Sequence, residues 1–405
     1  MPTDTVTVLP SWVWEIDVTN DPTSAATTWT DITQYVRGAT ITRGRQQETG
    51  RDQAGTCSLD LHNVDRRFDA FNTAGPYYPN IRPMRRVRCR ATYSAVTYPL
   101  FYGYLDDPVQ SYPDWGADAV TSFTCTDAFK VLANKLVSGD FPAQRSDLRV
   151  TAILDAIGWP AALRSLATGV SFLDPITLDR VSALEHLQQV ADSESGRLFI
   201  DASGNVKFVD RHAPYLTTSS ATFGESEINY VDVTFAGGDQ LIYNEILVQR
   251  AAAGAELRSA TDATSQGDYF TRTLSRTGML FDHDNEATDK ANFELSLYKD
   301  FRPRIVGMHL DGTYQPSTVW PQALGRELGD RLTVRKRPPG GGTMIEQESF
   351  LERIVHRVGV GTWDTDFGLS AIGIGYQIYP AGKTFFVLGD ATMGKLTTGN
   401  GVLSY

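Results

Sequence analysis

The chain has 405 residues, of which 41% are hydrophobic and 21% charged, and its formal net charge at pH 7 is −11. This composition is typical of a globular protein of two to three domains and excludes a disordered chain. The acidic balance argues against a dedicated duplex-binding protein, which needs a net basic face to neutralise phosphates. Because the first ten residues lack the basic and apolar segments of a signal peptide, and no run of about 18 apolar residues occurs, we expect neither secretion nor a membrane span.

The N-terminal third alternates apolar and polar residues with a period of two, which predicts β-strands. The predicted strands cover residues 40–44, 56–61, 86–93 and 100–105. The three cysteines, Cys57, Cys89 and Cys125, lie far apart in this kind of pattern. They are therefore predicted to be buried thiols of a protein made in a reducing compartment.

Basic charge is concentrated in the same third of the chain. Residues 33–104 contain eleven arginines against five acidic residues. The arginines that we predict to contact another subunit or a partner are Arg82, Arg85, Arg86, Arg88 and Arg90. An anionic partner surface is one interpretation. The other is a sheet face whose arginines pair within the chain, with Asp60, Asp65 and Asp69 as the nearest acids in sequence.

A compact α+β unit follows. Helices are predicted over 148–157 and 179–193, and a β-hairpin over 197–210. Asp179 or Ser182 is expected to cap the second helix, because either side chain can accept a hydrogen bond from the first turn. His186 is expected on the polar side of that helix.

Strand patterns then return and complete a mainly β chain. The predicted strands cover 230–235, 245–249, 304–310, 331–335, 349–360 and 367–378. Asp284 or Asn285 is expected to cap a helix that ends near Tyr298, and Pro338–Gly342 is predicted to be a flexible connection. The domains are predicted as a β domain at 1–135, an α+β unit at 136–214, a β domain at 215–380 and a Gly-rich tail at 381–405.

The tail has too few apolar residues to form a core of its own. Its candidate interface residues are Phe385, Phe386, Leu388, Leu403 and Tyr405. Adding a strand to a neighbouring subunit and packing back on its own domain both remain open.

The motifs of common catalytic and metal sites are incomplete. Gly382-Lys383-Thr384 ends like a phosphate-binding loop, but position 377 is glutamine where that loop needs glycine. Asp282–Glu286 lacks the glycine and the later glutamate of a calcium loop, and helix capping explains its acids. No histidine has a second histidine or cysteine at metal spacing. We therefore predict no catalytic residue, cofactor or metal.

Several segments, taken in order, nevertheless form a specific series. They are Trp29–Gly38, Ile41–Glu48, Ala54–Asn63, Asp65–Asp69, Tyr78–Pro83, Phe101–Tyr104, Ser182–Ala191, Gly204–Arg211 and Phe386–Leu396. In this order the chain resembles minor tail proteins of siphophages, especially those of phages that infect actinobacteria. The resemblance covers most of the chain and is weakest between residues 215 and 345.

The resemblance implies a tail hub, also called baseplate hub or tail-associated protein, located at the tail tip of the virion. Such hubs carry two tail-tube-like β-barrel or sandwich domains per chain, and three copies form a ring. The resemblance also implies several partners, namely the distal tail protein, the tail tube and tape measure proteins, and the central fibre or other minor tail proteins. It further implies that genomic DNA passes through the lumen without specific binding. We expect a structural protein and no enzyme.

Two alternatives remain. One is the distal tail protein, which has one tube-type domain per chain and forms a hexameric ring. The other is a cell-wall glycan binder or hydrolase at the tail tip, for which Trp320, Trp363, Asp364 and Asp366 are the candidate residues.

Overall fold

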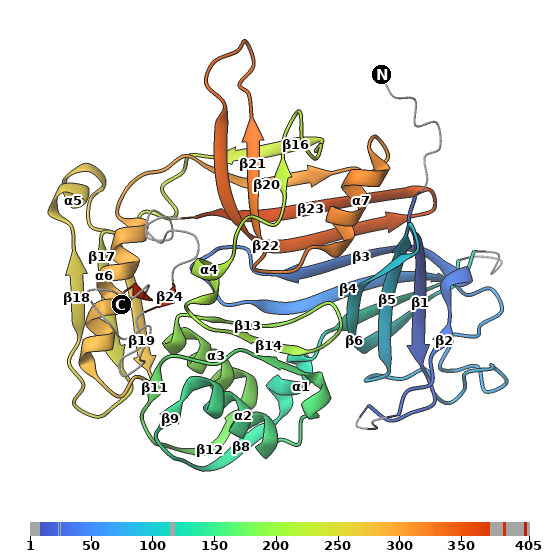
Figure 1. Ribbon diagram of the computed structural model, residues 1–405. Coiled ribbons are helices and arrows are strands. Elements are labelled where there is room, and N and C mark those ends of the chain that lie inside the picture. The colour runs from blue at the N-terminus through green and yellow to red at the C-terminus, as the bar shows by residue number, and fades with distance from the viewer. Residues whose placement is uncertain are drawn as a thin grey trace.

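The computed structural model describes residues 9–372, except 23, 25 and 114–117, and the backbone of two short paired strands, β24 (Thr384–Phe385) and β25 (Gly401–Val402). The fold is mainly β, as predicted (Figure 1). Within the described part, none of the helices has the length and apolar character needed to cross a membrane.

The predicted tail interface falls largely outside this part. Phe385 is described only as backbone of β24, and Phe386, Leu388, Leu403 and Tyr405 lie outside the described residues.

The first β part consists of antiparallel strands that follow the period-2 pattern. Its elements are β1 (Ser11–Asp17), β2 (Thr30–Asp31), η1 (Thr33–Tyr35), β3 (Val36–Gly44), β4 (Gln53–His62), β5 (Arg86–Tyr93), β6 (Val96–Ser111) and β7 (Val120–Thr126). In β4, buried Cys57 and Leu59 alternate with exposed Ser58 and Asp60. All three cysteines are buried free thiols, as predicted, and Cys57 lies opposite Cys125.

The α+β unit packs around its own core. Its elements are α1 (Phe129–Asn134), β8 (Leu136–Phe141), β9 (Gln144–Arg145), α2 (Ser146–Ala156), η2 (Ala161–Leu163), β10 (Arg164–Leu166), β11 (Phe172–Leu173), β12 (Ile176–Ser182), α3 (Ala183–Glu194), β13 (Arg197–Ile200), β14 (Val206–Val209) and α4 (Ala213–Leu216). The hairpin β13–β14 and both helices are confirmed, and Ser182 caps α3 by accepting a hydrogen bond from the Glu185 N–H. The placement of His186 on a polar helix face was wrong. It is buried, because α1, α2, β13 and β19 (Thr273–Met279) surround α3 on several sides.

The second β part contains β15 (Thr222–Phe223), β16 (Asp232–Ala236), β20 (Arg304–Leu310), α7 (Pro316–Gly325), β21 (Arg331–Lys336), β22 (Ile345–Gly359) and β23 (Thr362–Ala371). The turn between β22 and β23 is tighter than predicted, so β23 begins at Thr362 and not at Phe367. Gly361, at φ +77°, adopts the left-handed conformation that this short turn requires. Pro338–Gly342 belongs to the turn of the β21–β22 hairpin, which projects from the top of the molecule in Figure 1.

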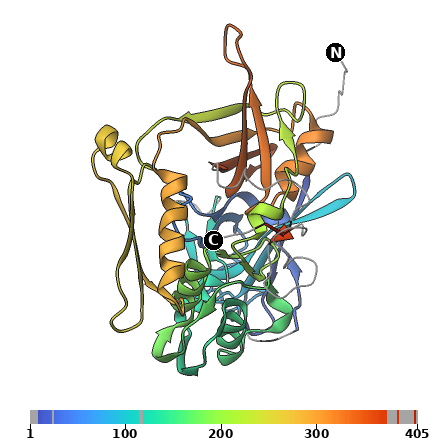
Figure 2. The ribbon, with the colours of Figure 1, turned by 60° about the vertical axis from the view of Figure 1, so that its left-hand side comes forward.

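A small unit is inserted between β16 and β20. It comprises β17 (Glu245–Arg250), β18 (Arg258–Thr261), α5 (Ala263–Tyr269), β19 and α6 (Asp284–Tyr298). Figure 2 shows α6 between this three-stranded sheet and the rest of the molecule. The capping prediction for α6 was wrong: the cap position is His283, without a side-chain hydrogen bond. Asp284 instead accepts a hydrogen bond of 2.6 Å from Arg250 Nε, because β17 brings that guanidinium to the helix start.

One large sheet joins the two β parts. Its strand order is β16-β20-β23-β22-β3-β4-β7-β6-β5-β1-β2. Outside this order, β21 pairs with β22, and β15 pairs with β21. The joint is the antiparallel pair β22–β3, in which Val355 lies opposite Thr42. Among the described residues the path is open and ends at β16 and β2. The domain boundaries at residues 135, 214 and 380 stay predictions.

Candidate assembly surface

Two of the predicted interface arginines are buried inside the chain. Arg86 is 5% exposed and lies 2.9 Å from Asp17 Oδ2, and it also donates to backbone carbonyls of the loop after β1. Arg85 is 2% exposed and donates to Asn80 and to the Asn20 carbonyl. A partner therefore has no access to these two guanidinium groups, which instead hold the loop after β1 against β5.

The next two arginines on the same face of β5 share one carboxylate. Arg88 binds Glu15 through two hydrogen bonds, from Nε at 2.7 Å and from Nη2 at 3.1 Å. Arg90 Nη2 donates to the same carboxylate at 2.8 Å. The Arg88 guanidinium also lies over the Trp29 ring, 4.1 Å from its centroid. Burial raises the pKa of Glu15, but the two arginines outweigh it and the net pKa is lowered.

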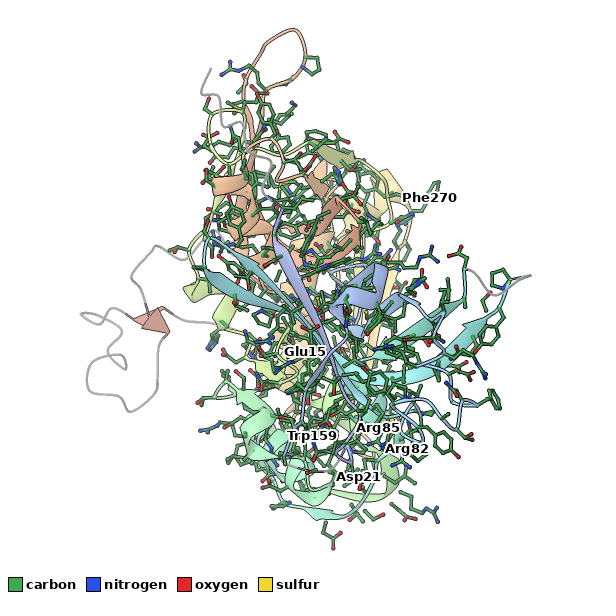
Figure 3. All side chains as sticks on the ribbon, turned by 90° about the vertical axis from the view of Figure 1, so that its right-hand side faces the viewer. Glu15, Asp21, Arg82, Arg85, Trp159 and Phe270 are labelled. Atoms are coloured by element: carbon green, nitrogen blue, oxygen red, sulfur yellow. The ribbon has the colours of Figure 1, made fainter. Side chains whose placement is uncertain are left out.

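Arg82 is the most exposed of the five arginines and lies 3.5 Å from Asp21 (Figure 3). Figure 3 shows Arg82, Arg85 and Asp21 close together on this side of the molecule. The acids that pair with the cluster thus come from β1 and the loop after it, and not from the predicted Asp60, Asp65 and Asp69. Partner contact through Arg82, Arg88 and Arg90 stays a prediction.

A second candidate surface is the solvated face of the large sheet. Residues directly opposite one another in a sheet share a face. One such row crosses six strands, from β23 to β6, and all of its members are polar and at least partly exposed. The row consists of Asp364, Arg357, Thr40, Ser58, Thr124 and Asp107. The neighbouring row includes Asp60, which accepts a hydrogen bond from Ser122. We call this surface the polar face.

Near β16 the polar face bears a charged cluster. His309 Nδ1 lies 2.6 Å from Asp366 Oδ1, and Arg357 also binds that carboxylate. Asp232, at the edge of the sheet, lies opposite His309. Burial raises the pKa of Asp366, but hydrogen bonds from Arg357 and His309 prevail, so the net pKa is lowered. The Asp366 carboxylate is therefore charged at neutral pH and is paired with Arg357.

The sheet also ends in two open edges. At one end β16 pairs, among the described residues, only on its β20 side, and Phe235 and the neighbouring Val231 are 47% and 60% exposed. At the other end β2 is two residues long. An unpaired strand edge with exposed apolar side chains is a template for adding a strand of another chain. Sequence reasoning missed this edge, since a pattern of alternation does not reveal which neighbours a strand has.

The candidate glycan-binding residues do not form a cleft. Trp320 is fully buried and Trp363 is 4% exposed, with their ring centroids 5.9 Å apart. Both belong to an aromatic core cluster that joins β1, α7 and β23, so neither can stack on a sugar. Asp364 and Asp366 lie on the polar face beside His309.

The acids at 282–286 have protein partners. Asp284 pairs with Arg250 and Arg258, and Glu286 lies 3.4 Å from Arg211. No group of three or more metal-ligating side chains gathers within the described residues.

Comparison with known proteins finds no matching family model and no matching curated protein. Solved structures do match. The 43 kDa tail protein of prophage MuSo2 from Shewanella oneidensis aligns with a TM-score of 0.56 at 14% identity, over 89% of this chain and 97% of that one. The tail protein of Neisseria meningitidis MC58 aligns with a TM-score of 0.55 at 11% identity, over 89% and 96%. The chain has the fold of these tail proteins.

The alignments cover 89% of this chain, so the likeness is not confined to one β part or to the α+β unit. At these identities the match concerns the arrangement of the backbone.

The missed partners of the arginine cluster, Glu15 and Asp17, lie on β1, a strand that the sequence analysis did not predict. In the sequence, apolar Trp14 and Ile16 alternate with Glu15 and Asp17, and this alternation was the available signal for a strand. The structure buries all four residues, so the two acids do not mark a solvated face of that strand.

Proposed function

We propose that the protein is a structural component of a phage tail tip, a hub of three copies that closes the end of the tail tube. In this role it connects the tube to the distal ring and the central fibre, and genomic DNA passes through its lumen without specific binding. The observation that carries the proposal is one continuous sheet, built from two β parts, whose edges at β16 and β2 are open within the part of the chain that the structure describes.

The open edges support ring formation. A head-to-tail contact between two different surfaces of identical chains closes into a ring when the rotation permits. If the β16 edge of one copy meets the β1–β2 end of the next, the sheets continue around the ring. Phe235 and Val231 then become buried at the contact.

The polar face supports the proposal that the ring encloses a channel for DNA. In such a ring one face of the continuous sheet points inward, and the polar face has the small hydroxyl side chains and carboxylates that suit a DNA channel. Asp60, Asp107 and Asp364 repel phosphates, so a duplex slides without being held. The excess of acid over base in the whole chain agrees with this role.

The mass of the purified protein in solution tests the proposal. Light scattering over a concentration range should give about three times 44.6 kDa, either alone or after addition of the tail tube or distal ring protein. A mass of six chains would favour the hexameric distal ring instead. A monomer that neither partner drives to a trimer would contradict the proposal.

A further inference from the structure

One end of the inserted unit presents two exposed phenylalanines. Phe270 follows α5, is 87% exposed and projects from the surface in Figure 3. Phe301 follows α6 and is 43% exposed. Hydrogen bonds join the two segments, because Asn244 Nδ2 donates both to the Phe270 carbonyl and to Ser265 Oγ. Ser265 Oγ in turn donates to the Lys299 carbonyl. Both phenylalanines therefore belong to one end of the unit, which we call the aromatic tip.

The backbone of Phe270 is strained. Its φ of +59° and ψ of 172° form a combination that is favourable only for glycine. Such a conformation costs free energy and persists only where the surrounding structure imposes it. Because the Phe270 ring is mostly in water, packing of the ring within the chain does not offset this cost.

The buried side chain of Asn244 imposes the conformation. Besides donating to the Phe270 carbonyl at 2.8 Å, it accepts a hydrogen bond of 2.8 Å from the Arg272 N–H. Arg272 itself donates to the Ile242 carbonyl and pairs with Asp239 at 2.8 Å. The chain is thus held on both sides of Thr271, and the fold keeps an apolar side chain pointing into solvent.

The surroundings of the aromatic tip are acidic. Its three loops contain five carboxylates and two cations. These loops are residues 237–245, 261–273 and 298–301. Both cations form ion pairs with acids of the same loops. Asp268 and Asp300 are exposed, and among the described residues no cation lies within 4 Å of either carboxylate. The tip therefore has an excess of negative charge beside its rings.

The combination of rings and acids selects a class of partner. Aromatic side chains are enriched at protein contacts, where a partner removes their large apolar surface from water. The excess of negative charge repels nucleic acid and anionic lipid, and it favours a partner that carries lysine or arginine. The partner must therefore offer apolar and basic side chains together.

We propose that the aromatic tip binds a basic, partly apolar segment of a different protein. Phe270 and Phe301 pack against its apolar side chains, and Asp268 and Asp300 bind its lysines or arginines. The charge of the tip carries the choice of a basic occupant, and the exposed rings carry the choice of a partly apolar one. The inference does not rest on the proposed ring, because the contact between copies lies at the edges of the large sheet.

Thermal unfolding tests whether the strain is kept for a purpose other than folding. Phe270→Gly removes the ring and relieves the strained backbone, so its Tm should equal or exceed that of the wild type. The matched control is Phe71→Gly, since Phe71 is 85% exposed but is not among the residues with positive φ. Its Tm should fall, because glycine increases the entropy of the unfolded chain. An equal fall in both variants would overturn the proposal.

Selection from a displayed library of random dodecapeptides tests the binding. The peptides are selected on the immobilised full chain and counter-selected on Phe270→Gly. We expect survivors that combine Lys or Arg with apolar residues. By fluorescence anisotropy, Phe270→Gly and the charge-reversed variant Asp268→Lys/Asp300→Lys should bind them at least about tenfold more weakly than the wild type. Phe71→Gly should bind them like the wild type.

Three binding results would also overturn the proposal. The first is that no peptide survives the counter-selection. The second is that the survivors lack basic residues, or bind the charge-reversed variant as tightly as the wild type. The third is sedimentation with phosphatidylcholine vesicles that Phe270→Gly abolishes, which would assign the tip to a lipid surface.

Discussion

Arg45 binds Glu352 through two hydrogen bonds, of 2.7 Å from Nε and 3.1 Å from Nη2, although 307 residues separate them in the chain. Arg45 follows β3 and Glu352 lies in β22, so the ion pair reinforces the joint between the two β parts. Burial raises the pKa of Glu352, but Arg45 and Arg197 outweigh it and bring the pKa to about 2. The carboxylate is therefore charged in the folded protein at neutral pH.

Replacing Glu352 with glutamine should destabilise the fold by about 3–5 kcal/mol, because the guanidinium of Arg45 then stays buried without its counter-ion. Urea unfolding followed by tryptophan fluorescence measures the change. Glu346→Gln is the control, since Glu346 lies on the same strand as Glu352 but pairs with Arg335 of β21 in an exposed position. This variant should cost less than about 1 kcal/mol. Equal effects of the two variants would refute the assigned role.

Acid should weaken the fold through buried histidine. Burial lowers the pKa of His356 to about 3, with Arg43 contributing. Below pH 6.5 the unfolded chain takes up a proton that the native chain does not, so stability falls with pH until about pH 3. Between pH 6.5 and 4.5 this amounts to about 2–3 kcal/mol.

The variant His356→Gln should remove that part of the pH dependence, measured by urea unfolding at several pH values. His283→Gln serves as control, since its ring is 78% exposed and should keep the dependence of the wild type. A variant of His356 that loses stability with acid as steeply as the wild type would contradict the explanation.

The arginine cluster should contribute mainly to the stability of the folded chain. Arg86→Met removes the partner of the buried Asp17 and the donor to the carbonyls of the loop after β1, at a cost of about 3 kcal/mol or more. Limited proteolysis should then cut between residues 18 and 29. Arg82→Met breaks an exposed pair of 3.5 Å and should cost less than about 1 kcal/mol. Undiminished stability of the Arg86 variant would return that residue to the candidate interface.

The open edge should control assembly. Phe235→Asp places a charge on the edge strand β16 and should reduce the fraction of trimer at a given concentration, because burial of an unpaired carboxylate at the contact is costly. Light scattering gives the fraction. Phe270→Asp is the control, since Phe270 is 87% exposed on the inserted unit (Figure 3), and it should assemble like the wild type. If both variants behave alike, the contact lies elsewhere.

The polar face should tolerate DNA only while it is acidic. Asp60→Lys/Asp107→Lys should increase affinity for duplex DNA in a mobility-shift assay, and the gain should shrink as salt rises. The control is Asp268→Lys/Asp300→Lys, which changes the net charge by the same amount at exposed positions of another unit. Its affinity for duplex DNA should increase less. Equal gains would mean that net charge alone, and not this face, sets the behaviour towards DNA.

Local patterns predicted many elements correctly. The strands at 86–93 and 304–310 agree with β5 and β20 at both ends, and Ser182 caps its helix as expected. Predictions that depended on the surroundings of a residue did worse. His186 was expected on a polar helix face but is enclosed by neighbouring elements, and Asp284 binds Arg250 instead of capping its helix.

The sequence by itself determined the period-2 strands, the β13–β14 hairpin and the burial of all three cysteines, because alternation and turn residues act over a few neighbouring positions. Only the tertiary structure decided that β22 pairs with β3 and that Glu15 and Asp17 neutralise the arginines of β5. These features join residues tens to hundreds of positions apart. Which strand or charge meets which is set by the packing of whole elements, and a local pattern carries no record of that choice.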